Sequence, residues 1–202
     1  MSLTLYYAPR TRATRPRWLL EELGVPFELV TLDLAKKEHK TPEYLAIHPH
    51  GSVPALRDGD LCLIESGAIC LYLADRFPHR GLAPVVENIE RGTYLQYMMY
   101  VYGTLEPALV PYFQHTRSLP EPKRDPEQVA TAKATIEVAK AWLTAQLGDG
   151  PWLMGMDFSA ADVVVGSTLI WARAMGLLEG STELLAYCDR LRARPAYQRA
   201  MA

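Results

Sequence analysis

The first third of the chain alternates between strand-like and helix-like patterns. Residues 3–7 (LTLYY) alternate in polarity and favour a strand, which Pro9 ends. The run RPRWLLEELG follows, with Pro16 suited to a first helical turn and Gly24 to a stop. Residues 27–32 (FELVTL) predict a second strand. A strand, a helix and a strand at this spacing predict a parallel pair with a right-handed crossover.

The next stretch predicts a short helix, a hairpin and a longer helix. The short helix covers residues 43–47, and a loop rich in proline and glycine follows it. Residues 55–57 and 61–64 flank an Asp-Gly pair, which is a strong signal for a tight hairpin. Helical spacing of apolar residues then covers 65–75. The order strand–helix–strand, helix, strand–strand–helix predicts a thioredoxin-like α/β domain over residues 1–79.

Residues 80–85 form a predicted linker, and the remainder reads as helical. No strand pattern stands out beyond the linker, so residues 86–202 predict an all-α domain. Its expected helices cover 87–110, 126–147, 159–175 and 183–192.

Composition narrows the function classes. Hydrophobic residues make up 49% of the 202 positions and charged residues 22%, which allows a substantial core. The formal net charge of -2 argues against nucleic acid or an anionic membrane as the main partner. No apolar run is long enough to span a membrane, and prolines and arginines interrupt the start before a signal-peptide core. Cys62, Cys70 and Cys188 have neither metal-ligand nor disulfide-framework spacing, so we expect core cysteines, no metal and a cytoplasmic location.

The pair Val53-Pro54 stands directly before the first hairpin strand. An X-Pro bond is the one peptide bond that adopts the cis form at low cost. A cis bond would turn the Val53 backbone outward, where it could pair with a peptide-like ligand as an added strand. The alternative is a trans proline that opens an edge strand; the hairpin and helix that follow favour the cis form.

The pair Glu65-Ser66 stands at the start of the 65–75 helix. Ser66 is a good N-cap, and free N–H groups of a first helical turn bind anions. With Glu65 beside them, the pair suits a zwitterion, whose carboxylate goes to the helix and whose ammonium goes to Glu65. The alternative is a routine cap with an acidic neighbour. The upstream Val53-Pro54 favours the ligand site.

The run HPHGSVPALRDGDLCLIESGAICLYLADRF closely resembles the corresponding stretch of glutathione transferases. The resemblance covers the whole first domain and is looser over the second. It implies that Val53 and Pro54 align the cysteinyl backbone of glutathione and that Glu65 and Ser66 hold its γ-glutamyl end. The upstream EHKTPEYL is similar to a family loop that meets the glycyl carboxylate, which implicates His39, Lys40 and His50; these three could equally be solvated loop residues.

The segment FSAADVVVG in the second half resembles the family's N-capping box. Ser159 would be the cap and Asp162 its partner. Such a box satisfies helix donors reciprocally, so we interpret it as part of folding and not as a binding site.

Four residues near the end of the first strand are candidates to activate the glutathione thiol. Family members use a tyrosine, serine or cysteine there. Tyr7-x-Pro9 resembles the tyrosine type, whereas counting back from Arg17 without a gap places that tyrosine on Tyr6. The same count puts Thr11 at the serine position. This count also places Arg12 at the position where tyrosine-type members carry an arginine and where cysteine-type members carry their cysteine. We predict Tyr7 with Arg12, with Tyr6 and Thr11 as alternatives; a tyrosine in a first strand is otherwise a packing residue.

Two further sets of side chains have several interpretations. Arg10, Arg12, Arg15 and Arg17 could form a solvated face or a phosphate-binding patch. An aromatic and methionine-rich set could line an adaptable apolar site for the second substrate, although most of it is expected in the core or a dimer interface: Tyr94, Tyr97, Met98, Met99, Tyr100, Tyr102, Tyr112 and Phe113.

These features predict a glutathione transferase that joins the glutathione thiolate to a small apolar electrophile. Glutathione is the expected co-substrate, and the resemblance implies a homodimer. A first alternative is a glutathione-dependent isomerase or dehalogenase on the same fold, favoured if Thr11 touches the sulfur. A second is a non-catalytic interaction module, which would have a degraded glutathione site. The absence of a cysteine in the first loop argues against disulfide exchange.

Overall fold

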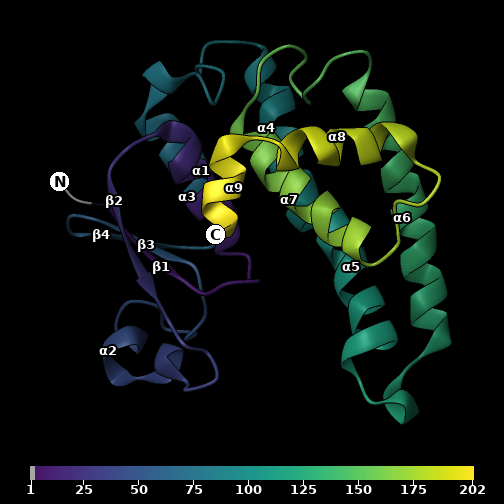
Figure 1. Cartoon of the computed structure of the whole chain (residues 1–202), viewed down its shortest axis with the longest axis horizontal. Helices are drawn as coiled ribbons and strands as arrows, with labels where there is room; N and C mark the ends of the chain where they lie inside the picture. Colours follow the sequence, from purple (N-terminus) through teal and green to yellow (C-terminus); the bar gives the residue numbers. More distant parts are fainter. Residues whose placement is uncertain (1–2) are drawn as a thin grey trace. The chain divides into compact units, whose positions relative to one another are not determined.

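A computed structural model describes residues 3–202, which form two compact units. The first comprises the residues up to Val85 together with Ala193–Ala202, and the second comprises Val86–Arg192. Figure 1 shows the strands in the N-terminal part of the chain and the long helices in the rest. The expected fold class, a thioredoxin-like α/β domain followed by an all-α domain, is confirmed.

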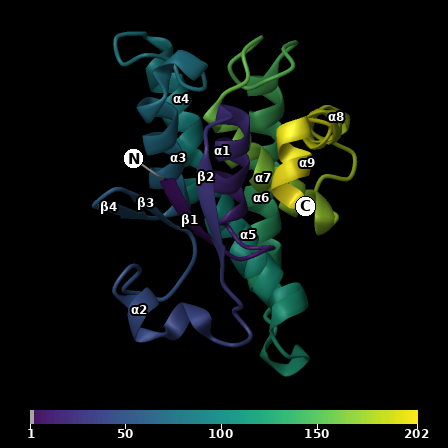
Figure 2. The same cartoon turned by 60° about the vertical axis from the view of Figure 1, so that its left-hand side comes forward.

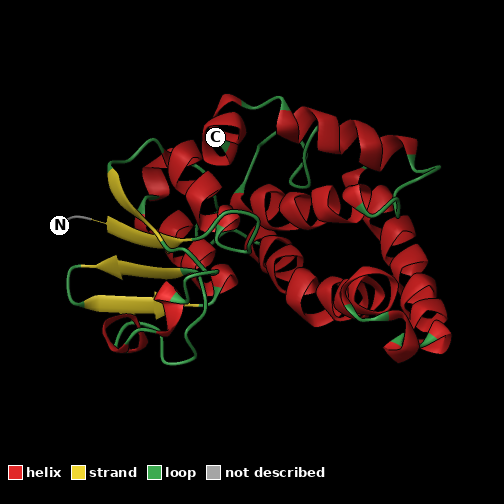
Figure 3. Ribbon diagram, turned by 60° about the horizontal axis from the view of Figure 1, so that its bottom comes forward, coloured by secondary structure: helices red, strands yellow, loops and turns green. Residues whose placement is uncertain are grey.

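The first unit is built on a mixed sheet of four strands in the order β2-β1-β3-β4. Figure 3 shows the strands of this sheet as yellow arrows. β1 pairs in parallel with β2, and β3 is antiparallel to both β1 and β4. The helices α1 and α3 pack against each other, and Leu5 of β1, Leu19 of α1 and Ile69 of α3 are all buried. The elements are β1 (Leu3–Tyr7), α1 (Thr14–Leu23), β2 (Phe27–Thr31), α2 (Pro42–Leu45), β3 (Ala55–Asp58), β4 (Leu61–Ile64) and α3 (Ser66–Arg76), with 3-10 turns at Glu38–Lys40 and Pro78–Arg80.

The last ten residues belong to the first unit, whereas the sequence-based boundary places them in the helical domain. They form a helix that the sequence analysis missed, α9 (Pro195–Met201), and this helix packs on α1 (Figure 2). The Tyr197 ring meets the Trp18 indole edge-on, with ring centres 5.0 Å apart. A seven-residue helix has little stability of its own, so tertiary packing decides where it belongs.

The second unit is helical throughout its regular structure. Its elements are α4 (Glu90–Tyr100), α5 (Glu106–Phe113), α6 (Pro126–Leu147), α7 (Ala160–Ala174) and α8 (Thr182–Arg192), with π-helical segments at Val101–Leu105 and Gln114–Ser118 and a 3-10 turn at Glu121–Lys123. The expected capping box is present at the start of α7, where Ser159 and Asp162 bond reciprocally. Gly166 of α7 gives Leu191 of α8 the room to approach, because a Cβ there would overlap the leucine side chain.

No helix within residues 3–202 is both long enough and apolar enough to cross a membrane. The same residues contain no group of three or more His, Cys, Asp or Glu side chains that could hold a metal ion.

Candidate glutathione site

The strand register brings three of the predicted motifs to one end of the sheet. Tyr6 of β1 lies opposite Ala55, the first residue of β3. Ala55 in turn lies opposite Ile64, the last residue of β4. The end of β1, the Val53-Pro54 pair and the β4–α3 junction therefore meet at the same edge, although they are far apart in sequence.

The Val53-Pro54 bond is cis, as the sequence analysis expected. Pro54 is buried and Val53 is half-buried. The segment before them is tied down from α2, because the Tyr44 hydroxyl donates to the Ser52 carbonyl at 2.6 Å. This hydrogen bond holds the backbone directly before Val53-Pro54, the pair that could offer its backbone to a peptide ligand.

The start of α3 corrects one prediction. Ser66 is not the N-cap but the first residue of the helix, and Glu65 takes the cap position. The Glu65 side chain makes no capping hydrogen bond, and the residue has φ 72°, a left-handed backbone that is costly for a non-glycine residue and concentrates at functional sites. Glu65 is exposed, whereas Ser66 is 4% exposed. Because no cap side chain covers the first turn, its positive end can accept an external anion.

Arg15 lies beside the candidate site, although the sequence analysis named it only within the arginine set of the first loop and helix. Its side chain is buried, and Nη1 donates to the Ser66 hydroxyl at 3.4 Å. A positive charge therefore lies beside the first turn of α3. The available signal was helical spacing, since Arg15 lies three and four residues before Trp18 and Leu19 and so shares their buried face.

The four arginines of the first loop and helix do not form a single patch. Arg10 and Arg12 are exposed, Arg15 is buried and Arg17 is half-buried. The Arg17 guanidinium lies over the Tyr7 ring, with its central carbon 4.9 Å from the ring centre. These four arginines therefore do not form a common phosphate-binding face.

The two tyrosines of β1 lie on opposite faces of the sheet. Tyr7 is buried, like Leu3 and Leu5, and contacts Arg17 of α1. Tyr6 is only half-buried and packs against Tyr44 of α2, with ring centres 5.6 Å apart. The structure thus separates the two tyrosine assignments that the sequence left one residue apart.

The Thr11 hydroxyl is already engaged with the backbone. It donates to the Ala8 carbonyl at 2.7 Å and accepts from the Ala13 N–H at 3.2 Å. A hydroxyl has a single proton to donate, so Thr11 would have to give up the first bond to donate to a sulfur. Arg12 follows in the same loop, before the first turn of α1.

The predicted basic residues lie in two loops that touch. The Lys40 ammonium donates to the His50 carbonyl at 2.9 Å. Gly51 has φ 54°, and a Cβ there would lie 2.6 Å from the His39 carbonyl, so only glycine fits this contact. His48, which the sequence analysis passed over, is buried, and its ring contacts those of Tyr44 and His50. Its pKa is lowered mainly by burial and to a smaller extent by the neighbouring His50.

Comparison with known proteins identifies the family of this chain. Residues 1–75 match the family profile "Glutathione S-transferase, N-terminal domain", and residues 85–184 match "Glutathione S-transferase, C-terminal domain". This chain belongs to the glutathione S-transferase family.

Several relatives match this chain over nearly its whole length. Glutathione S-transferase GstA of Escherichia coli O157:H7 is 32% identical, covering 99% of this chain and 98% of its own. Disulfide-bond oxidoreductase YfcG of Escherichia coli K12 is 30% identical, covering 98% and 94%. A sphingomonad glutathione S-transferase solved in complex with glutathione has a TM-score of 0.84 at 30% identity, covering 98% and 96%. A ternary complex of BphK, a bacterial transferase, has a TM-score of 0.85 at 30% identity, covering 98% and 97%.

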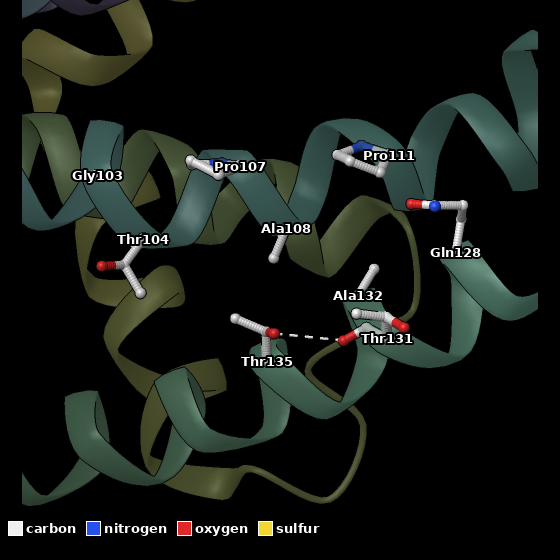
Figure 4. Close-up of a pocket in the computed structure, with 9 residues that line it drawn as sticks. All are labelled: Gly103, Thr104, Pro107, Ala108, Pro111, Gln128, Thr131, Ala132 and Thr135. Carbon is white, nitrogen blue, oxygen red and sulfur yellow. Dashed lines mark hydrogen bonds between the residues drawn. The ribbon is translucent and has the colours of Figure 1, made fainter.

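The second unit contains a pocket of about 270 Å³ between α5 and α6 (Figure 4). None of the predicted glutathione-site residues lines it, and the lining side chains are small and neutral: Gly103, Thr104, Pro107, Ala108, Pro111, Gln128, Thr131, Ala132 and Thr135. Among the aromatic and methionine residues of this unit, Tyr94, Tyr97 and Met98 are buried in its core.

Proposed function

We propose that this protein is a glutathione transferase that conjugates the glutathione sulfur to a small apolar electrophile. The observation that carries the proposal is the meeting of the cis Val53-Pro54 pair, the β4–α3 junction and the Tyr7 strand end at one sheet edge. Related structures bound to glutathione support the ligand. By the same family relationship we propose a homodimer, which sedimentation of the purified protein would test.

The tripeptide would bind along this edge from end to end. The Val53 backbone would pair with the cysteinyl unit in strand fashion. The first turn of α3, with the Arg15 charge beside Ser66, would hold the γ-glutamyl carboxylate, and Glu65 would hold its ammonium. Lys40, with His39 and His50 in the adjoining loops, would face the glycyl carboxylate.

Tyr7, helped by Arg12, would favour the thiolate form of glutathione. A free thiol titrates near pH 8.5, so lowering its pKa by about two units requires about 2.7 kcal/mol of preferential thiolate stabilisation. One or two hydrogen bonds to the charged sulfur, at about 1.5–3 kcal/mol each, would supply it. The thiolate then forms a sulfur–carbon bond, and the leaving group departs with the electron pair of the bond that breaks.

Calorimetric titration with glutathione tests the binding half of the proposal. We expect micromolar-to-millimolar affinity that weakens about tenfold or more in Ser66→Ala, because a buried hydroxyl at the carboxylate subsite is lost. Ser118→Ala, which changes an exposed serine of the second unit, is the matched control and should bind normally. No binding to the wild-type protein would overturn the transferase proposal in favour of an interaction module.

Turnover of chlorodinitrobenzene tests the chemistry. Tyr7→Phe should lower kcat/KM about 10-fold to 100-fold, whereas Tyr6→Phe and Thr11→Val should stay near wild type. If only Thr11→Val loses activity, the result would favour the isomerase or dehalogenase alternative. The relative YfcG makes a disulfide substrate a useful second assay; with no cysteine among residues 8–13, we expect conjugation to dominate.

A further inference from the structure

The helix α9 is fastened to α1 by two arginine–glutamate pairs. Arg194 donates to both carboxylate oxygens of Glu22, at 2.6 and 2.8 Å. Arg199 pairs with the neighbouring Glu21 at 2.7 Å. The Glu22 side chain is 7% exposed, and a two-pronged arginine–carboxylate contact is both strong and orienting. The last turn of α9 therefore has a defined position on α1.

Arg17 connects that last turn to the candidate thiol-activating tyrosine. Its Nη2 donates to the Arg199 carbonyl at 3.1 Å. This carbonyl lies in the last turn of α9, and a cation at a helix C-terminus is favourable. On its other side the same guanidinium lies over the Tyr7 ring, 4.9 Å from the ring centre, a cation–π distance.

These two contacts help to orient the guanidinium of Arg17. Its Nε is buried and has no hydrogen-bond partner within residues 3–202. Tyr7 is itself 5% exposed, so the position of its hydroxyl follows from what its ring packs against. Loosening α9 would release Arg17 and, through it, remove one of the groups that hold the Tyr7 ring.

We propose that α9 and Arg17 act together as a positioning device for Tyr7. Arg17 is a positioning residue, since it acts through the tyrosine ring, and the C-terminal ten residues are part of the active centre's support although they follow the helical domain in sequence. The inference rests on the proposed function, because it assigns Arg17 a role in the reaction of Tyr7.

A double-mutant cycle on chlorodinitrobenzene turnover tests the device. Arg17→Met should lower kcat about 3-fold to 10-fold while the calorimetric affinity for glutathione stays within about twofold. Arg17→Lys, which keeps a cation near the ring, should recover part of the loss. Arg194→Ala, which removes one of the two pairs that hold α9 and leaves Tyr7 and Arg17 unchanged, should lower kcat in the same direction. Arg173→Met removes an exposed arginine–aspartate pair of the second unit and serves as the control.

The decisive comparison is made in the Tyr7→Phe background. If Arg17 acts through the tyrosine hydroxyl, Arg17→Met should have no further effect there. Equal losses in both backgrounds, or unchanged kcat in Arg17→Met, would overturn the positioning role while leaving the transferase proposal intact. A wild-type protein that binds glutathione but turns over no electrophile would instead overturn the proposed function, and this inference with it.

Discussion

The capping carboxylate Asp162 offers the sharpest test of how the second unit is held together. It is 0% exposed, and each of its oxygens accepts two hydrogen bonds. Oδ2 accepts from the Ser159 N–H at 2.9 Å and the Ser159 hydroxyl at 3.1 Å. Oδ1 accepts from the Leu153 N–H at 2.9 Å and the Tyr187 hydroxyl at 2.8 Å. Burial raises the pKa of Asp162, and the four donors offset part of that effect.

Replacing the Asp162 carboxylate by an amide should make the second unit less stable to unfolding. If the Asp162→Asn amide oxygen keeps the Ser159 bonds, its NH2 group faces the Leu153 N–H, and donor meets donor. The loss of a charge-assisted bond costs about 1.5–3 kcal/mol, and the orphaned buried N–H adds about 1–3 kcal/mol. The Tyr187 oxygen can still accept from the amide. We therefore expect Asp162→Asn to lower the free energy of unfolding by about 2.5–6 kcal/mol.

Urea unfolding followed by circular dichroism and tryptophan fluorescence provides the measurement. Trp152 is a local reporter, because its ring lies 5.1 Å from that of Phe158, just before the cap. Ser159→Ala, which removes the cap hydroxyl, should lower the free energy of unfolding by about 1 kcal/mol and is the variant with which Asp162→Asn is compared. An Asp162→Asn protein within about 1 kcal/mol of wild type, or more stable than Ser159→Ala, would refute the argument that this carboxylate joins three segments.

Three other predictions follow from close contacts and burial. Gly166→Ala should cost about 1–3 kcal/mol in urea unfolding because its Cβ overlaps Leu191, whereas Gly92→Ala, which meets open space, should be neutral or stabilising. Gly51→Ala should weaken calorimetric glutathione binding several-fold more than Gly24→Ala, since both have positive φ but only Gly51 would meet the His39 carbonyl. Because the pKa of His48 is lowered, the folded state favours the neutral ring. The free energy of unfolding should therefore be highest above about pH 6.5 and decrease as the pH falls below that value. His48→Gln should make this decrease smaller, which unfolding midpoints measured across pH would show.

Local signals predicted much of the first unit and its site. The alternation in residues 3–7, the Asp-Gly turn and Gly24 with φ 60° all correspond to observed elements, and the Val53-Pro54 bond is cis. Each depends on the conformational preference of a few neighbouring residues, which sequence reports directly.

The predictions that failed had rested on residue type or periodicity alone. Ser66 is a good N-cap by type, yet Glu65 takes that position with a left-handed backbone. Arg15 is a charged residue by type, yet it is buried beside α3. The two π-helical segments around α5 carry no periodicity that distinguishes them from an ordinary helix.

By itself the sequence determined the fold class, the order of the elements from β1 to α3 and the family, because these are encoded in short contiguous runs. Only the tertiary structure decided that Tyr6 and Tyr7 face different partners, that Thr11 has its proton engaged, and that α9 belongs with α1. Strand register and helix docking are set by contacts between residues far apart in the chain, and such contacts exist only once the backbone has folded.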